Sequence, residues 1–325
     1  MLAIGSKIDE VRIDGRLDFM RRDLDYFSDL GMGAVEIPVH GLDAIVHGRL
    51  NRPRTASVRN ILHSHDFAYS VHAPNPLNLM DRHQGALHYQ VFRASLEFAL
   101  EIGSGIVVYH AGRYVPEEEF VIPGNVMLSA EDEKSLLDRE ACAIRDLADE
   151  FPDVYICIEN ARPYLYHSPY CYGESPDALR EQVQKISRPN VRINLDTGHL
   201  FMAAKFYGFD PVEAVMDMAP LIKHVHVHDN FGLPIHHHEK QQTHLVPFGR
   251  GDAHMPVGWG EIPIDAILGA FIDDYRGIMI TELRGRYFEH TGESIENLKK
   301  ILANLKSEPV SASPGIGLCE VRNGR

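Results

Sequence analysis

The feature that most constrains the fold is a regular alternation of short β-rich runs with longer helical patterns. Eight runs rich in Val, Ile or Tyr lie at residues 2–8, 34–39, 68–74, 105–112, 154–160, 191–199, 222–230 and 277–284. Segments with a hydrophobic period near 3.6 residues lie between them, including 19–31, 86–103 and 133–151. Strands that alternate with helices form parallel sheets. The pattern therefore predicts an α/β protein, and its eight repeats predict a (β/α)8 TIM barrel.

The alternative is an open doubly wound sheet, but nothing in the sequence resembles its glycine-rich dinucleotide loop. The 325 residues allow two domains, although barrels of about 250 residues often form one. We predict a single barrel domain over residues 1–306 and an irregular extension over 307–325, which is rich in Ser, Pro and Gly. Long connections at 113–128, 161–174 and 231–261 follow strands. They are expected at the C-terminal face of the barrel, where active sites lie.

Charge and hydropathy exclude several classes of protein. A net charge of −14 and a pI near 5.7 argue against binding a phosphate backbone, which needs clustered Lys and Arg. No apolar run approaches the ~18 residues of a membrane span, and the first residues lack the charged-then-apolar pattern of a signal segment. We expect a cytoplasmic enzyme that acts on a small molecule and binds neither nucleic acid nor membrane. The oligomeric state is left open.

Ionisable residues recur near the carboxyl ends of the β-rich runs. These residues are His72, His110, Glu159, Asp196, His199, His226 and Glu282. Burying one unpaired charge costs several kcal/mol, so such a set at one end of a barrel is unsuited to core packing. A shared cation removes the cost, because it neutralises carboxylates and accepts imidazole ligands. Mixed His and carboxylate ligands suit Zn, Mn, Fe or Co better than Mg or Ca.

Three of these features resemble the xylose isomerase-like TIM barrel superfamily: LDTGH at 195–199, HVHDN at 226–230 and Glu282. The resemblance covers roughly residues 30–300. This group includes sugar isomerases and epimerases and the type IV apurinic endonucleases. The isomerase-type members hold one metal ion, or a close pair, through four residues. By resemblance, these are Glu159, Asp196, His226 and Glu282.

The endonuclease-type members instead hold three zinc ions with nine ligands. Their extra positions are matched by His72 in HAP, His110 in HAG, His199, and an Asp-x-His followed by Gly-x-Gly in the stretch DAHMPVGWG at 252–260. The resemblance thus implies a trinuclear, zinc-type centre. Its ligands would be His72, His110, Glu159, Asp196, His199, His226, Asp252, His254 and Glu282.

We therefore predict a metal-dependent hydrolase of a small phosphate ester or phosphodiester, in which a metal-bridging water attacks and Glu159 holds it. The first alternative is a sugar or sugar-phosphate isomerase or epimerase with one or two metal ions. In that case Glu159 and Glu282 exchange protons at carbon, and His199 contacts the substrate. The second alternative is an apurinic endonuclease of DNA repair. The negative charge and the departure after Glu159, ENARPYLYH at 159–167, speak against it.

Substrate contacts are expected just beyond the strand ends. Arg113, Arg162 and Arg284 lie there and could bind a phosphate group in a bidentate manner. Glu36 in VEI, by resemblance to the isomerase-like members, and His228 are further expected substrate contacts. Within DAHMPVGWG, Gly258 and Gly260 are expected to turn the loop back, leaving Trp259 as a lid or as packing. The His-rich stretch 236–244 receives no assigned role.

Overall fold

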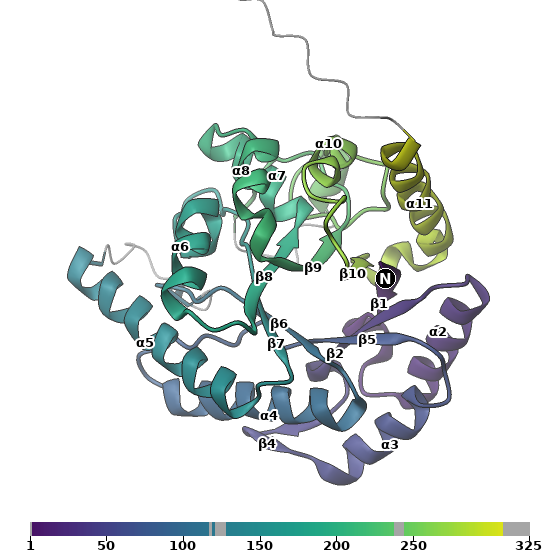
Figure 1. The fold of residues 1–325 in the computed structure, drawn as a ribbon, viewed down its shortest axis with the longest axis horizontal. Helices are drawn as coiled ribbons and strands as arrows, with labels where there is room; N and C mark the ends of the chain where they lie inside the picture. The colour runs from purple at the N-terminus through teal and green to yellow at the C-terminus, as the bar shows by residue number, and fades with distance from the viewer. Residues whose placement is uncertain (1, 117–118, 121–127, 237–243, 308–325) are drawn as a thin grey trace, which may run out of the picture.

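The computed structural model describes residues 2–116, 119–120, 128–236 and 244–307. Eight parallel strands close into a barrel in the order β1-β10-β9-β8-β7-β6-β5-β2 (Figure 1). Their bounds are β1 Ala3–Lys7, β2 Ala34–Pro38, β5 Ala68–His72, β6 Ile106–His110, β7 Tyr155–Glu159, β8 Val191–Asp196, β9 Ile222–Val227 and β10 Ile278–Thr281. Each expected β-rich run contains one of these strands. The (β/α)8 prediction is confirmed.

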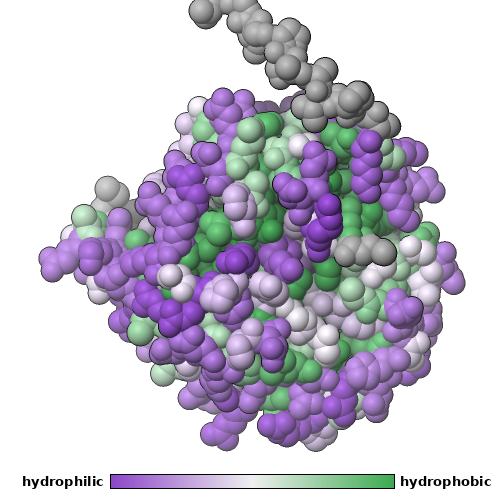
Figure 2. Space-filling view, viewed as in Figure 1, coloured by the Kyte–Doolittle hydropathy of each residue, from purple (hydrophilic) through white to green (hydrophobic). Residues whose placement is uncertain are grey.

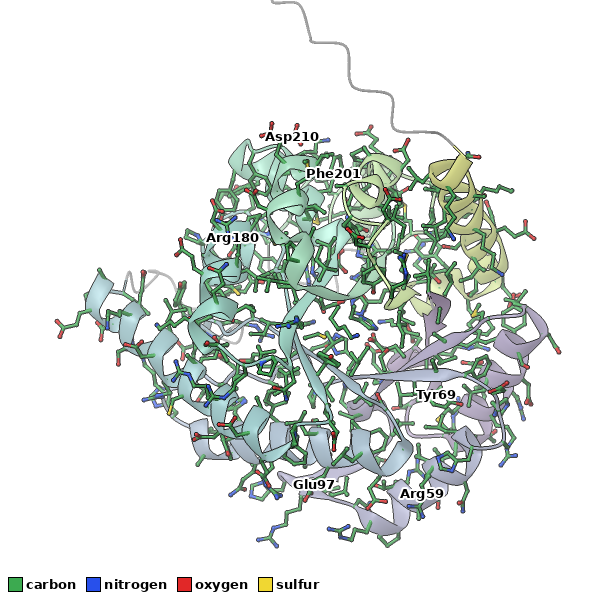
Figure 3. All side chains as sticks on the ribbon, viewed as in Figure 1. Arg59, Tyr69, Glu97, Arg180, Phe201 and Asp210 are labelled. Carbon is green, nitrogen blue, oxygen red and sulfur yellow. The ribbon has the colours of Figure 1, made fainter. Side chains whose placement is uncertain are left out.

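Helices surround the barrel on its outside (Figure 1). They are α1 Glu10–Ile13, α2 Leu17–Asp29, α3 Arg52–Leu62, α4 Gly85–Ile102, α5 Ala130–Glu150, α6 Pro176–Ile186, α7 Thr197–Tyr207, α8 Pro211–Met218, α10 Ile264–Gly269 and α11 Thr291–Ser307. Charged residues on this outer layer, such as Arg59, Glu97 and Arg180, lie away from the barrel centre (Figure 3). Figure 2 shows hydrophilic residues over most of the rim of this face, and both hydrophobic and hydrophilic residues nearer its centre.

Local sequence explains where helices begin. Ser175 accepts a hydrogen bond from Ala178 N and precedes Pro176 at the start of α6, and Asp210 caps α8 in the same way. Such caps satisfy N–H groups that lack a partner in the first turn. A two-stranded hairpin, β3 (Ile45–Val46) with β4 (Arg49–Leu50), was not expected, because two-residue strands carry no periodic pattern.

The expected run 191–199 is part strand and part helix. Strand β8 ends at Asp196, and α7 begins at Thr197. The Asp196 Oδ1 atom accepts a hydrogen bond from His199 N at 2.7 Å, which is the contact of a helix N-cap. His199 therefore lies in the first turn of α7, and its expected place at the end of a strand was wrong.

Several expected features fall on residues outside the described part of the chain. These are the extension beyond residue 307, part of the connection 113–128, and residues 237–243 of the His-rich stretch. The domain boundary at residue 306 stays a prediction. Among the described residues, no helix is both long and apolar enough to cross a bilayer.

Candidate metal centre

Ligand-type side chains gather at the C-terminal end of the barrel in three clusters, and Glu36, His224 and His226 form a fourth group that shares His226 with the second. Within each cluster, one ligand atom per residue lies within 4.8 Å of all the others. The first cluster is His72, His110 and Glu159; the second is Glu159, Asp196, His226 and Glu282; the third is His199, His228, Asp252 and His254. The nine residues expected to bind metal thus all lie in these clusters, although the sequence segments that carry them span residues 72–282.

Glu159 joins the first two clusters, because His residues of both approach one of its oxygens. Its Oε2 atom lies 3.6 Å from His72 Nε2, 3.7 Å from His110 Nε2 and 3.5 Å from His226 Nδ1. Strand pairing explains the proximity, since His110 is the direct neighbour of Glu159 in the β6–β7 register. The side chain of Asn194 also donates to Glu159 Oε2 at 3.0 Å. One carboxylate is therefore held where two ions could share it.

Three of the cluster histidines bind a backbone carbonyl oxygen through one ring nitrogen and turn the other nitrogen toward a cluster. The Nδ1 atoms of His72, His199 and His254 lie 2.7–2.9 Å from the carbonyl oxygens of Ala73, Asn160 and Glu282, respectively. A carbonyl only accepts, so each Nδ1 carries the proton, and in the neutral ring Nε2 keeps its lone pair. This arrangement is typical of metal-binding histidines.

His226 has the opposite orientation. Its Nε2 atom lies 3.0 Å from Glu36 Oε1, and its Nδ1 atom faces the second cluster, 3.2 Å from Glu282 Oε2. Glu36 is fully buried and also accepts from Ser70 Oγ at 3.2 Å. The carboxylate thus fixes the proton on Nε2 and leaves Nδ1 as the nitrogen available to the cluster.

Three of the cluster carboxylates, those of Glu159, Asp252 and Glu282, have pKa values lowered by neighbouring groups. Burial alone would raise the pKa of Glu159, but the imidazoles of His110 and His226 hold it well below its usual value. For Asp252, burial is outweighed by His254 and Arg162, which also keep its pKa well below the ordinary range. The pKa of Glu282 is likewise low, because Lys7 and His226 outweigh the effect of burial.

These charges fit a divalent cation. The second cluster brings the oxygens of Glu159, Asp196 and Glu282 within 4.8 Å of one another, and all three residues are buried. Two like charges 4 Å apart repel by about 4 kcal/mol at an effective dielectric constant near 20. A divalent cation held by these three carboxylates and the His226 imidazole would convert that repulsion into attraction. The donor set is the mixed nitrogen and oxygen type that first-row transition metals accept.

In the third cluster, the guanidinium of Arg162 supplies a positive charge beside Asp252. Asp252 Oδ2 lies 2.7 Å from His254 Nε2, 3.2 Å from His199 Nε2 and 3.3 Å from Arg162 Nη1. The rings of His228 and His254 stack with centroids 4.0 Å apart. Two buried atoms here, Asp252 Oδ1 and His228 Nδ1, have no hydrogen-bond partner among the described residues.

A cavity of about 660 Å³ opens above the clusters. Its lining includes five of the expected metal ligands: His110, Glu159, His199, His254 and Glu282. Arg113, Arg162 and Arg284 also line it, and their contact with substrate stays a prediction. The cavity is large enough for a sugar-sized molecule, and its arginines are favourable for an anionic group.

Glu36 and His228, two expected substrate contacts, do not line this cavity. Glu36 lies below the second cluster as the partner of His226. His228 is fully buried, and its Nε2 atom lies 3.1 Å from both oxygens of Asp196. Both side chains therefore face the ligands, and their contact with substrate stays a prediction.

Sequence reasoning missed three residues that hold the clusters in place. Lys7, at the end of β1, contacts Glu282 Oε1 through Nζ at 3.2 Å and lines the cavity. Asn160 donates to Asp196 O at 3.0 Å and accepts from Asp196 N at 2.7 Å. Asn194 contacts Glu159 and His226 from below. The signal for Lys7 was available, since it too is an ionisable residue at a strand end.

The loop at 252–260 is tied to the end of β9 by Asp229. Backbone hydrogen bonds join Asp229 and Met255 in both directions, at 2.9 and 3.0 Å. The Asp229 carboxylate accepts from Gly258 N at 3.0 Å and from Ile262 N at 3.2 Å. A Cβ atom on Gly260 would lie 2.4 Å from Asp229 Oδ1, so only glycine fits there. The expected turn is thus produced by one buried carboxylate.

Comparison with known proteins places these observations in a family. The model of the xylose isomerase-like TIM barrel family matches residues 24–307. The uncharacterized protein MJ1311 of Methanocaldococcus jannaschii is 30% identical over 204 residues, which are 61% of this chain and 58% of the relative. This chain thus matches less than two thirds of that relative's length. The uncharacterized protein MJ1614 of the same organism is 24% identical over 258 residues, 78% of this chain and 85% of the relative.

Solved structures share the barrel at low sequence identity. A D-tagatose 3-epimerase-like protein has a TM-score of 0.70 and 21% identity, covering 94% of this chain and 98% of its own. The 3-keto-D-glucoside 4-epimerase YcjR of E. coli has a TM-score of 0.63 and 15% identity, covering 93% and 100%. An L-ribulose 3-epimerase has a TM-score of 0.61 and 15% identity, covering 96% and 89%. At these identities the likeness establishes the fold.

Proposed function

Since this chain belongs to the xylose isomerase-like TIM barrel family, we propose that it is a metal-dependent isomerase or epimerase of a small sugar-like molecule. One observation carries the proposal: Glu159 and Glu282 approach the same atom, His226 Nδ1, at 3.5 and 3.2 Å, and both line the cavity. The names of the solved epimerases with the same fold support it. We prefer the isomerase or epimerase function to the phosphate-ester hydrolase predicted from the sequence.

Each carboxylate has a defined part in this chemistry. A divalent cation in the second cluster would polarise neighbouring carbonyl and hydroxyl oxygens of the substrate, which makes the adjacent C–H bond more acidic. One of the two ionised carboxylates, Glu159 or Glu282, removes the proton from that carbon, and the other returns a proton from the opposite face. Lys7 Nζ, 3.2 Å from Glu282 Oε1, stabilises the ionised form of Glu282 between these steps.

A hydrolase of a small phosphate ester, with three zinc ions, is the second candidate function. Two observations favour it: the first and third clusters exist beside the second, and five arginines line the cavity. A one-metal reaction does not require the first and third clusters. Several ions together would lower the pKa of a bridging water and neutralise a phosphoryl group.

Proton exchange at carbon tests the proposal directly. We would incubate the protein, reconstituted with Mn, Co or Zn, with a panel of ketopentoses and ketohexoses and their phosphates in D2O. NMR should then show one deuterium incorporated at the carbon that inverts or isomerises. The Glu282→Gln variant should lose exchange. Hydrolysis of p-nitrophenyl phosphate or its diester by the same preparation, without deuterium incorporation in any sugar, would favour the second candidate.

A further inference from the structure

Arg162 is placed unusually for a residue expected to bind substrate. Its Nη1 atom lies 3.2 Å from His199 Nε2 and 3.3 Å from Asp252 Oδ2. Both atoms belong to the third cluster. The guanidinium group thus lies against two atoms that would have to bind a metal ion there.

The contact with His199 involves the nitrogen that a metal would use. His199 Nδ1 donates to the carbonyl of Asn160 at 2.9 Å, so the lone pair of the neutral ring is on Nε2. Arg162 Nη1, 3.2 Å from that nitrogen, occupies the space that a metal ion bound to it would need. The guanidinium group keeps its charge at every accessible pH, and it also repels a divalent cation. Arg162 and a metal ion therefore exclude one another at His199.

The surroundings hold Arg162 in this position. Its Nη2 atom donates to the hydroxyl of Tyr164 at 2.8 Å, and Tyr164 is almost completely buried. The Arg162 side chain is itself 13% exposed. Moving the guanidinium away from the cluster would break the Tyr164 contact as well as the ion pair with Asp252. The position is built into the connection after β7, which begins ENARPY at 159–164.

From this geometry we propose that Arg162 competes with a metal ion for the third cluster and makes it the weakest of the three metal sites. The positive charge that Asp252 needs is supplied by the protein. Metal ions then occupy the first and second clusters before the third. This inference concerns metal binding alone and does not depend on which reaction the enzyme performs.

Zinc binding tests the proposal without an activity assay. We would strip the full-length protein of metal, reconstitute it with zinc, and measure zinc per chain by mass spectrometry and affinity by competition with a chromophoric chelator. The Arg162→Leu variant should bind zinc at its weakest site at least tenfold more tightly than the wild type. Adding Asp252→Asn to that variant should abolish the gain, which would assign it to the third cluster.

Arg284→Leu is the matched control. Arg284 also lines the cavity and donates to the backbone oxygen of Asp252 at 2.9 Å, but this atom is not a ligand of the cluster. Its zinc binding should match the wild type. The proposal is overturned if Arg162→Leu has the zinc content and affinities of the wild type, or if its gain survives Asp252→Asn. Circular dichroism and thermal unfolding of each metal-free variant show whether it is folded. If Arg162→Leu does not fold, Arg162→Gln, a smaller change, takes its place.

Discussion

Replacing Asp229 with Ala should free the loop that carries Asp252 and His254. The Asp229 carboxylate is buried and makes two long-range hydrogen bonds, to Gly258 N and Ile262 N. Hydrogen bonds to a charged group contribute about 1.5–3 kcal/mol each. The variant should therefore lose about 3–6 kcal/mol of unfolding free energy, which urea denaturation followed by circular dichroism would measure.

The single tryptophan of the chain reports on the loop itself. Trp259 donates through Nε1 to Glu293 on α11 at 2.8 Å, and its ring lies 4.6 Å from that of His290. Trp259 is 39% exposed in the folded protein, and release of the loop would expose the rest of its ring to water. The emission of Asp229→Ala should therefore shift to longer wavelength at urea concentrations below the main unfolding transition.

Two control variants, Asp229→Asn and Asp217→Ala, are compared with Asp229→Ala. Asp229→Asn keeps the Oδ1 acceptor that serves Ile262 N and should lose about half as much, on the order of 1.5–3 kcal/mol. Asp217→Ala removes an exposed ion pair with Arg180 at 3.5 Å and should cost below ~1 kcal/mol. If Asp229→Ala is no less stable than Asp217→Ala, and the Trp259 emission is unchanged, Asp229 does not anchor the loop.

Two further perturbations test the support of the clusters. Replacing Glu36 with Leu removes the partner of His226 Nε2 and should weaken zinc binding by about 10–100-fold, as a chelator competition would measure. The Glu36→Gln variant keeps an acceptor oxygen and should lose less affinity. If Glu36→Leu binds zinc as tightly as the wild type, Glu36 only packs against His226. An added Cβ on Gly198 would lie 2.0 Å from His228 Cε1, so Gly198→Ala should cost about 1–3 kcal/mol in urea denaturation. At Gly105 the nearest atom would be 3.8 Å away, and a Gly105→Ala variant as destabilised as Gly198→Ala would show that the crowding at His228 is not the cause.

The sequence by itself determined the architecture. Parallel strands covered by helices are buried on both faces, so they appear as short continuous apolar runs, and all eight runs contain barrel strands. The ligand-type residues were found for a related reason. An ionisable residue such as Glu159 or Asp196 at the end of a buried strand is costly without a partner, so it stands out from its neighbours. The Asp-x-His of the loop after β9 was found only through the family resemblance.

The tertiary structure decided which way the side chains face and which groups meet. His199 moved from the expected strand to the first turn of α7, because the Asp196 carboxylate caps that helix. Strand alternation alone could not place Glu36 below His226, since the two lie 190 positions apart in the chain. The sequence pattern also could not predict the contact between the Arg162 guanidinium and Asp252, because that contact depends on how the connections after β7 and β9 fold back over the barrel. Short-range sequence patterns determine the strands and helices. The charged groups around a metal-ligand residue such as Asp252 depend on loops, and the paths of those loops are set by long-range contacts.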